Sequence, residues 1–149
     1  MSYEIEVQNC QKSVTIASSE MSRITRDILT FLKIRRAVVS IILLTNRSIR
    51  VVNKKFLAHD YPTDVITFDL SDGELSRSGK TIRELDGEIY ISAVMAKENA
   101  VRFKTRPRQE IVLYLVHGIL HLCGYDDHSR REQERMRRRE REVLAHLNF

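Results

Sequence analysis

Two histidines in the second half of the chain, His117 and His121, have the spacing of metal ligands. Residues four apart project from the same face of a helix about one turn apart, so both imidazoles can bind one ion. They end an almost wholly apolar stretch, where two imidazoles without partners would be costly to bury. We therefore predict a metal site at this pair rather than two packed or exposed histidines.

The turn that follows the second histidine offers a third ligand. Asp127 comes six residues after His121, which is the spacing of the third ligand in metzincin-type zinc sites, whereas His128 is chemically the better ligand for zinc. The residues leave both alternatives open. Three protein ligands leave a fourth position for water, so the pattern predicts one zinc ion per chain and a hydrolase.

Gly118 distinguishes this helix from the zinc-protease motif H-E-x-x-H, because it stands where the general-base glutamate would be. Ordinary zinc proteolysis is therefore disfavoured. Zinc lowers the pKa of bound water to about 7, so hydroxide can form without that glutamate. We assign no catalytic group beyond the metal-bound water. Gly118 itself either packs the helix or lets a strand or a substrate approach closely.

Alternating strand and helix patterns must position these residues. Segments with period-two or β-branched apolar residues predict strands, and apolar residues three and four apart predict helices. The predicted strands cover 3–7, 37–44, 64–70 and 87–92, the predicted helices cover 18–32, 45–56, 93–103, 107–121 and 129–147, and an open loop is expected over 71–86. The helix from Pro107 is so apolar that it must be buried on nearly all sides. This order predicts a single α+β domain over residues 1–149, with a sheet packed against helices.

The composition fits a cytoplasmic globular protein, and its basic charge favours an anionic partner without deciding the matter, since many basic proteins bind none. The net charge of +5 and the pI near 9.4 favour nucleic acid. No apolar run approaches the roughly 20 residues that cross a bilayer, which excludes an integral membrane protein. The N-terminal residues lack the basic and then apolar pattern of a signal peptide. The two distant cysteines, Cys10 and Cys123, predict no disulfide framework, which fits a reducing cytoplasm.

Three segments, in order along the chain, carry a family resemblance. They are Asn53-Lys54-Lys55-Phe56 followed by Asp60-Tyr61-Pro62-Thr63-Asp64-Val65-Ile66-Thr67-Phe68, then Gly87-Glu88-Ile89-Tyr90-Ile91-Ser92, and then His117-Gly118-Ile119-Leu120-His121-Leu122-Cys123-Gly124-Tyr125-Asp126 with a histidine soon after. Together they resemble the signature of the YbeY family of bacterial metal-dependent endoribonucleases. Two positions depart from that signature. Leu57 stands where the family usually has arginine, and one extra residue precedes His128.

The resemblance implies a zincin-like α+β fold, with a small mixed sheet and the metal site on a buried helix. It also implies a zinc-dependent endoribonuclease that acts on single-stranded RNA, matures the 3′ end of 16S ribosomal RNA, takes part in ribosome quality control and associates with the small ribosomal subunit. Two alternatives are a zinc hydrolase of a non-RNA bond and a non-catalytic, ribosome-associated RNA-binding factor with a structural metal. A structural zinc would need four protein ligands.

Polar residues before and within the third predicted strand are candidates for substrate contact or for support of the metal ligands. Asp60 and Asp64 can orient a metal-bound histidine or a substrate hydroxyl, and turn formation is the alternative explanation for them. Thr63 and Asn53 are interpreted in the same two ways. The candidate replacements for the arginine that the family usually has at position 57 are Lys54, Lys55 and His59.

Two basic runs flank the predicted metal helix. The first contains Arg102, Lys104, Arg106 and Arg108, and the last helix alternates arginines with glutamates. Opposite charges four residues apart explain much of the last helix as a solvated surface. We expect the first run to contact RNA phosphates, and affinity from such contacts falls as salt rises.

Overall fold

The computed structural model describes residues 1–57, 64–71 and 82–149. Its sheet has the strand order β1-β2-β4-β3, with β1 (Ser2–Asn9), β2 (Arg36–Leu44), β3 (Val65–Asp69) and β4 (Glu84–Ser92). β1, β2 and β4 run parallel, and β3 lies antiparallel to β4 at the edge. The helices are α1 (Ser18–Phe31), α2 (Asn46–Leu57), α4 (Ala93–Phe103), α5 (Pro107–Leu122) and α6 (Arg130–His146). The predicted α+β fold with a small mixed sheet is confirmed.

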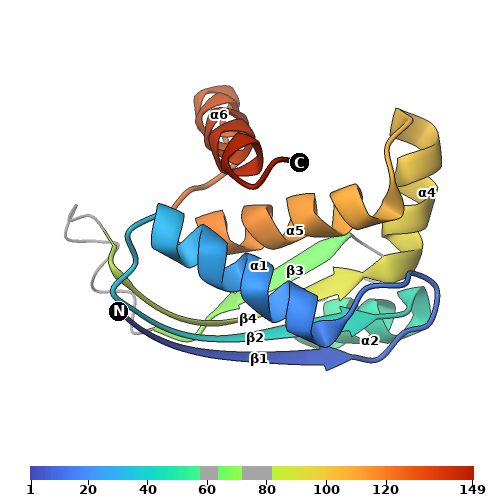
Figure 1. Ribbon diagram of the computed structural model, residues 1–149. Helices are drawn as coiled ribbons and strands as arrows, with labels where there is room; N and C mark the ends of the chain where they lie inside the picture. Colours follow the sequence, from blue (N-terminus) through green and yellow to red (C-terminus); the bar gives the residue numbers. More distant parts are fainter. Residues whose placement is uncertain (58–63, 72–81) are drawn as a thin grey trace.

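The helices cover the two faces of the sheet unequally (Figure 1). α1 and α5 lie across one face, and α6 lies on the side of α5 that faces away from the sheet. The main apolar core fills the space beneath α1 and α5, where Ile41, Ile89 and Leu115 are completely buried. A smaller apolar cluster on the other face, which includes Ile42 and Ile49, holds α2 against the sheet.

Most predicted elements are confirmed to within two residues at each end, but the start of β4 was predicted wrongly. Residues 84–86 belong to this strand and not to an open loop. Leu85 is buried and pairs with Ala37, while Glu84 and Asp86 point to the opposite face. The inward position between Leu85 and Ile89 is occupied by Gly87, which interrupts the apolar alternation that predicts a half-buried strand. The rest of the expected loop, 72–81, lies outside the described residues.

α5 is buried along nearly its whole length, as its apolar sequence predicts. Ile111, Leu115 and Ile119 are inaccessible to solvent. Its one buried acid, Glu110, accepts a hydrogen bond of 2.6 Å from the hydroxyl of Thr105, so the carboxylate has a partner. Among the described residues, no helix is both long enough and apolar enough to cross a membrane.

Two glycines allow α5 to approach the sheet closely. A Cβ on Gly118 would lie 2.8 Å from Cγ2 of Ile89 and 3.1 Å from Oγ1 of Thr67. A Cβ on Gly87 in β4 would lie 2.5 Å from Cδ2 of Leu122 and 2.7 Å from a backbone carbonyl oxygen of β3. Gly118 is therefore a packing residue between α5 and the sheet, and no larger side chain fits there without displacing its neighbours.

We predict that Gly87→Ala lowers the free energy of unfolding by about 1–3 kcal/mol, because the added methyl group overpacks the contact between β4 and Leu122. Urea denaturation of both proteins measures the change. The control is Val101→Ala on the exposed surface of α4, where a change within about 0.5 kcal/mol is expected. An unfolding midpoint for Gly87→Ala equal to that of the unchanged protein would contradict this account of the contact.

Candidate metal centre

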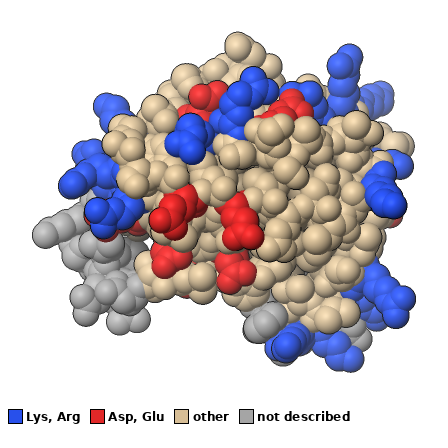
Figure 2. Space-filling view, turned by 60° about the horizontal axis from the view of Figure 1, so that its bottom comes forward, with Lys and Arg blue, Asp and Glu red and all other residues tan. Residues whose placement is uncertain are grey.

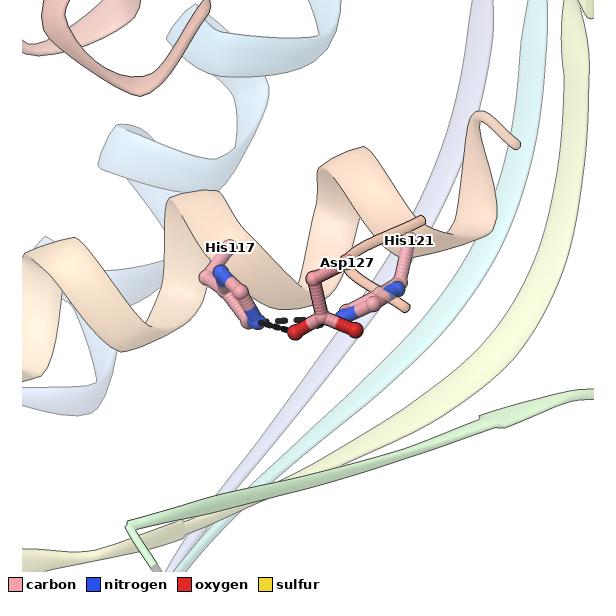
Figure 3. A group of neighbouring side chains, drawn as sticks. All are labelled: His117, His121 and Asp127. Atoms are coloured by element: carbon pink, nitrogen blue, oxygen red, sulfur yellow. Dashed lines mark hydrogen bonds and ion pairs between the residues drawn. The ribbon is translucent and has the colours of Figure 1, made fainter. Parts of the chain in front are cut away.

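The two predicted ligands on α5 face one another. The Nε2 atoms of His117 and His121 lie 3.0 Å apart, and the two rings are nearly perpendicular, with an interplanar angle of 83° (Figure 3). Each side chain is 25% exposed. Two zinc-bound nitrogens in a tetrahedral site lie about 3.3 Å apart when each bond is near 2.05 Å. The observed separation is therefore close to what a shared zinc ion requires.

A carboxylate from the following turn completes the group. Oδ2 of Asp127 lies 3.7 Å from Nε2 of His117 and 3.8 Å from Nε2 of His121 (Figure 3). The candidate ligand atoms of all three residues lie within 4.8 Å of one another. Two imidazoles and a carboxylate are a usual donor set for zinc. The residues present therefore fit the predicted ion.

The chain reaches this arrangement through a tight turn after α5. Gly124 has a φ of +94°, which favours glycine, and its N–H donates to the carbonyl of His121 over 3.0 Å. The amide group of Gln133 in α6 then donates to the carbonyl of Asp127 over 3.0 Å. The turn is thus held at both ends, and Asp127 is brought back under the histidine face of α5.

His128, the alternative third ligand, lies away from the pair. Its side chain is 81% exposed, and its Nε2 is 3.2 Å from the carboxylate of Asp126. Asp126, Asp127 and His128 also form a second, more exposed group whose ligand atoms lie within 4.8 Å of one another. Of the two alternatives that the sequence left open, Asp127 is the one that the structure brings to His117 and His121.

The two histidines have opposite shifts in pKa. Burial tends to lower the pKa of His117, but a hydrogen bond to Glu140 and the negative charges nearby raise it above its ordinary value. Burial and the neighbouring His117 lower the pKa of His121. Because a metal binds the neutral imidazole, protons compete with the metal mainly at His117.

A groove of about 400 Å³ opens over the three candidate ligands, and β3 forms its opposite wall. The described residues that line it are Asp64, Val65, Ile66, Thr67, Asp69, His117, His121, Leu122 and Asp127. Three of them are carboxylates and none is a lysine or an arginine. A bound cation would offset this negative charge, so the groove suits an anionic substrate only when a metal is present.

The predicted supporting residues have different positions. Asp64 lines the groove, and its Oδ1 also accepts a hydrogen bond of 2.8 Å from the N–H of Val65, so it both faces the site and helps to start β3. Asn53 is 2% exposed in α2 and is not among the described groove-lining residues, and Lys55 is exposed on the same helix. His59, Asp60 and Thr63 lie outside the described residues.

Sequence reasoning missed Glu140, which contacts His117 directly. Oε1 of Glu140 lies 2.7 Å from Nδ1 of His117. In the sequence, this glutamate is one of several acids in the arginine-rich last helix. It follows Met136 by four residues and precedes Val143 by three, and both of these are buried. The helical spacing to these two apolar residues is the signal that marks it as facing inward.

The basic residues lie away from the groove. Arg102, Lys104 and Arg106 are exposed at the corner between α4 and α5, at the end of α5 opposite the histidines, and Arg108 forms an ion pair with Glu20. In the last helix, Arg130 pairs with Glu134 and Arg139 pairs with Glu142, as the charge pattern predicts. Figure 2 shows acidic side chains grouped on the outer face of the sheet, with basic side chains towards the rim.

The chain is similar to a family of known enzymes over almost its whole length. A family model described as Endoribonuclease YbeY matches residues 6–148. A Salinibacter ruber protein of that name is 38% identical over 106 residues, covering 71% of this chain and 68% of the relative. A Syntrophus aciditrophicus protein of that name is 30% identical over 150 residues, covering 99% of this chain and 92% of the relative. The solution structure of TM1509 from Thermotoga maritima matches with a TM-score of 0.63 at 26% identity, covering 97% of this chain and 92% of that one.

We predict that Asp127→Ala weakens zinc binding at least about tenfold, while His128→Ala changes it by less than about twofold, because only Asp127 faces the histidine pair. Competition with a chromophoric chelator gives both dissociation constants. A larger loss in His128→Ala than in Asp127→Ala would make His128 the third ligand.

Proposed function

Because this chain belongs to the Endoribonuclease YbeY family, we propose that it is a metal-dependent endoribonuclease that cleaves single-stranded RNA. The observation that carries this proposal is the meeting of His117, His121 and Asp127 beneath an open groove. In the proposal these three residues hold one zinc ion. Three protein ligands leave coordination free for the substrate side, as in catalytic zinc sites.

The residues of the site have separate tasks in this proposal. Bound zinc would supply Lewis-acid chemistry at the phosphodiester and a nucleophile from water. His117 and His121 bind as neutral imidazoles, and Asp127 binds as a carboxylate. Asp64 and Asp69 on the opposite wall repel phosphate, so they restrict productive binding to the loaded site. Thr67 offers the groove a neutral hydroxyl, which can donate a hydrogen bond to RNA without adding charge.

We extend the proposal to the biological role on the strength of the family resemblance. The substrate would be ribosomal RNA, with maturation of the 3′ end of 16S ribosomal RNA and ribosome quality control as the processes. The partner would be the small ribosomal subunit, and the compartment would be the cytoplasm, where this RNA is found. One sheet and one continuous main core support a single domain over residues 1–149, and the family match to 6–148 agrees with it.

The first alternative is a ribosome-associated RNA-binding factor with a structural metal. The observation in its favour is the second group of Asp126, Asp127 and His128, which could bring a fourth ligand to the site. Hydrolysis of an amide by the zinc-protease route is disfavoured, because Gly118 packs against Ile89 where the protease motif has its glutamate.

We predict that a His117→Ala, His121→Ala double variant loses both near-stoichiometric zinc and cleavage of single-stranded RNA. Metal catalysis supplies several kcal/mol, so the rate should fall about a thousandfold or more. Elemental analysis and a gel assay with a labelled oligonucleotide measure the two properties, with His128→Ala as the matched histidine control. Zinc without cleavage in the unchanged protein would favour the binding factor, and absence of metal from it would remove the basis of the proposal.

We also predict that RNA affinity falls steeply with salt, and that the corner residues account for part of this dependence. Replacing Arg102, Lys104 and Arg106 together by alanine should reduce the slope of log affinity against log salt by about 2, since each phosphate contact to a single strand contributes about 0.7. Fluorescence anisotropy with the zinc-loaded protein measures the slope. A Lys12→Ala, Arg47→Ala variant, changed at exposed residues elsewhere, is the control. An unchanged slope in the triple variant would rule out the corner as an RNA contact.

A further inference from the structure

The contact between His117 and Glu140 joins the candidate metal centre to the last helix. Nδ1 of His117 and Oε1 of Glu140 are 2.7 Å apart, within hydrogen-bond distance. The Glu140 side chain is only 14% exposed. A largely buried carboxylate needs a strong partner, and among the described side chains its hydrogen-bond partner is His117.

We propose that Glu140 is a positioning residue for the metal centre, which fixes the tautomer and the orientation of the His117 ring. The inference rests on the proposed function, because it assumes that His117 binds a metal. A carboxylate can only accept a hydrogen bond, so Nδ1 of His117 must carry the hydrogen. The lone pair is then on Nε2, which is the atom that faces His121 and Asp127.

The second consequence of this contact is electronic. A carboxylate that accepts the second ring N–H of a histidine ligand makes the imidazole a stronger donor to the metal. It also removes the alternative tautomer, in which Nε2 would carry a hydrogen towards the ion. His121 is oriented differently, since its ring forms a hydrogen bond with the backbone of Tyr125 and not with a glutamate side chain. The support of His117 therefore depends on a side chain that can be substituted.

The position of Glu140 is set by the packing of α6. Met136, one turn before it, is 1% exposed, and Val143, about one turn after it, is completely buried. Both belong to the main apolar core. Because residues three and four apart share a helix face, these anchors direct Glu140 towards α5. The last helix is thus part of the metal centre and not only a charged surface.

The experiment compares zinc affinity in Glu140→Ala and Glu140→Gln with that in Glu142→Ala, by competition between zinc and a chromophoric chelator. Glu142 lies on the same helix and pairs with Arg139 near the surface, so its loss should leave affinity unchanged. We expect Glu140→Ala to weaken binding by about 10–100-fold. Glu140→Gln should fall between this variant and the unchanged protein, since its amide oxygen can still accept from Nδ1 but carries no charge.

Two further measurements separate positioning from simple stabilisation of α6. In the metal-free protein, at a pH high enough for the His117 ring to be neutral, nitrogen NMR should show hydrogen on Nδ1, and a mixture of tautomers in Glu140→Ala. In a His117→Ala background, adding Glu140→Ala should have no further effect on zinc affinity, because the ring that it positions is gone. Urea denaturation of each metal-free variant reports the structural contribution of the contact between α5 and α6.

A failure of the positioning role can be told apart from a failure of the proposed function. If the unchanged protein binds no zinc, the metal centre itself is wrong. If it binds zinc and Glu140→Ala binds it within about twofold, or if Glu140→Ala weakens binding equally with and without His117, the metal centre stands and the positioning role is overturned.

Discussion

The close approach of α5 to β3 and β4 is the contact on which the rest of the structure depends. It requires glycine at 118, where a methyl group would meet Ile89 and Thr67, and it places His117 directly beside that contact. The same packing brings β3 to the other side of the groove. A helix held further from the sheet would leave the histidines without an opposite wall. The apolar packing of one helix therefore determines both the stability of the core and the shape of the site.

The charge distribution adds a second constraint. The molecule carries a net charge of +5, yet the groove is lined by three carboxylates and the outer face of the sheet is acidic (Figure 2). In the proposed function, long-range attraction of RNA would therefore come from the rim, including the corner between α4 and α5, while local binding in the groove would depend on the cation. The same overall charge that predicts a nucleic-acid partner from composition does not identify the site. The candidate site is marked instead by Asp64 and Asp69, which line the groove opposite the histidines.

How far the sequence predicts this molecule can be argued from single residues. His117 and His121 were predictable because helical periodicity alone places them together. The choice between Asp127 and His128 was not, because a left-handed glycine at 124 decides which side chain returns to α5. Glu140 was missed because its pairing with His117 spans 23 residues and depends on how α6 docks, which no local pattern encodes. The start of β4 was missed for a different reason, since its pattern is local but Gly87 interrupts the apolar alternation between Leu85 and Ile89.

A carboxylate as third ligand would change what the proposed metal centre can do. With three neutral imidazoles, an occupied site would keep the whole charge of the ion, whereas Asp127 cancels one unit of it. Glu140, which is hydrogen-bonded to Nδ1 of His117, would donate further electron density to the bound ion through the His117 ring. Both effects would make a bound ion a weaker Lewis acid but a more tightly held one. Because the turn and α6 already hold these groups in place through Gly124, Gln133 and Met136, metal binding would require little reorganisation, and the scaffold would retain an ion whose charge is partly neutralised.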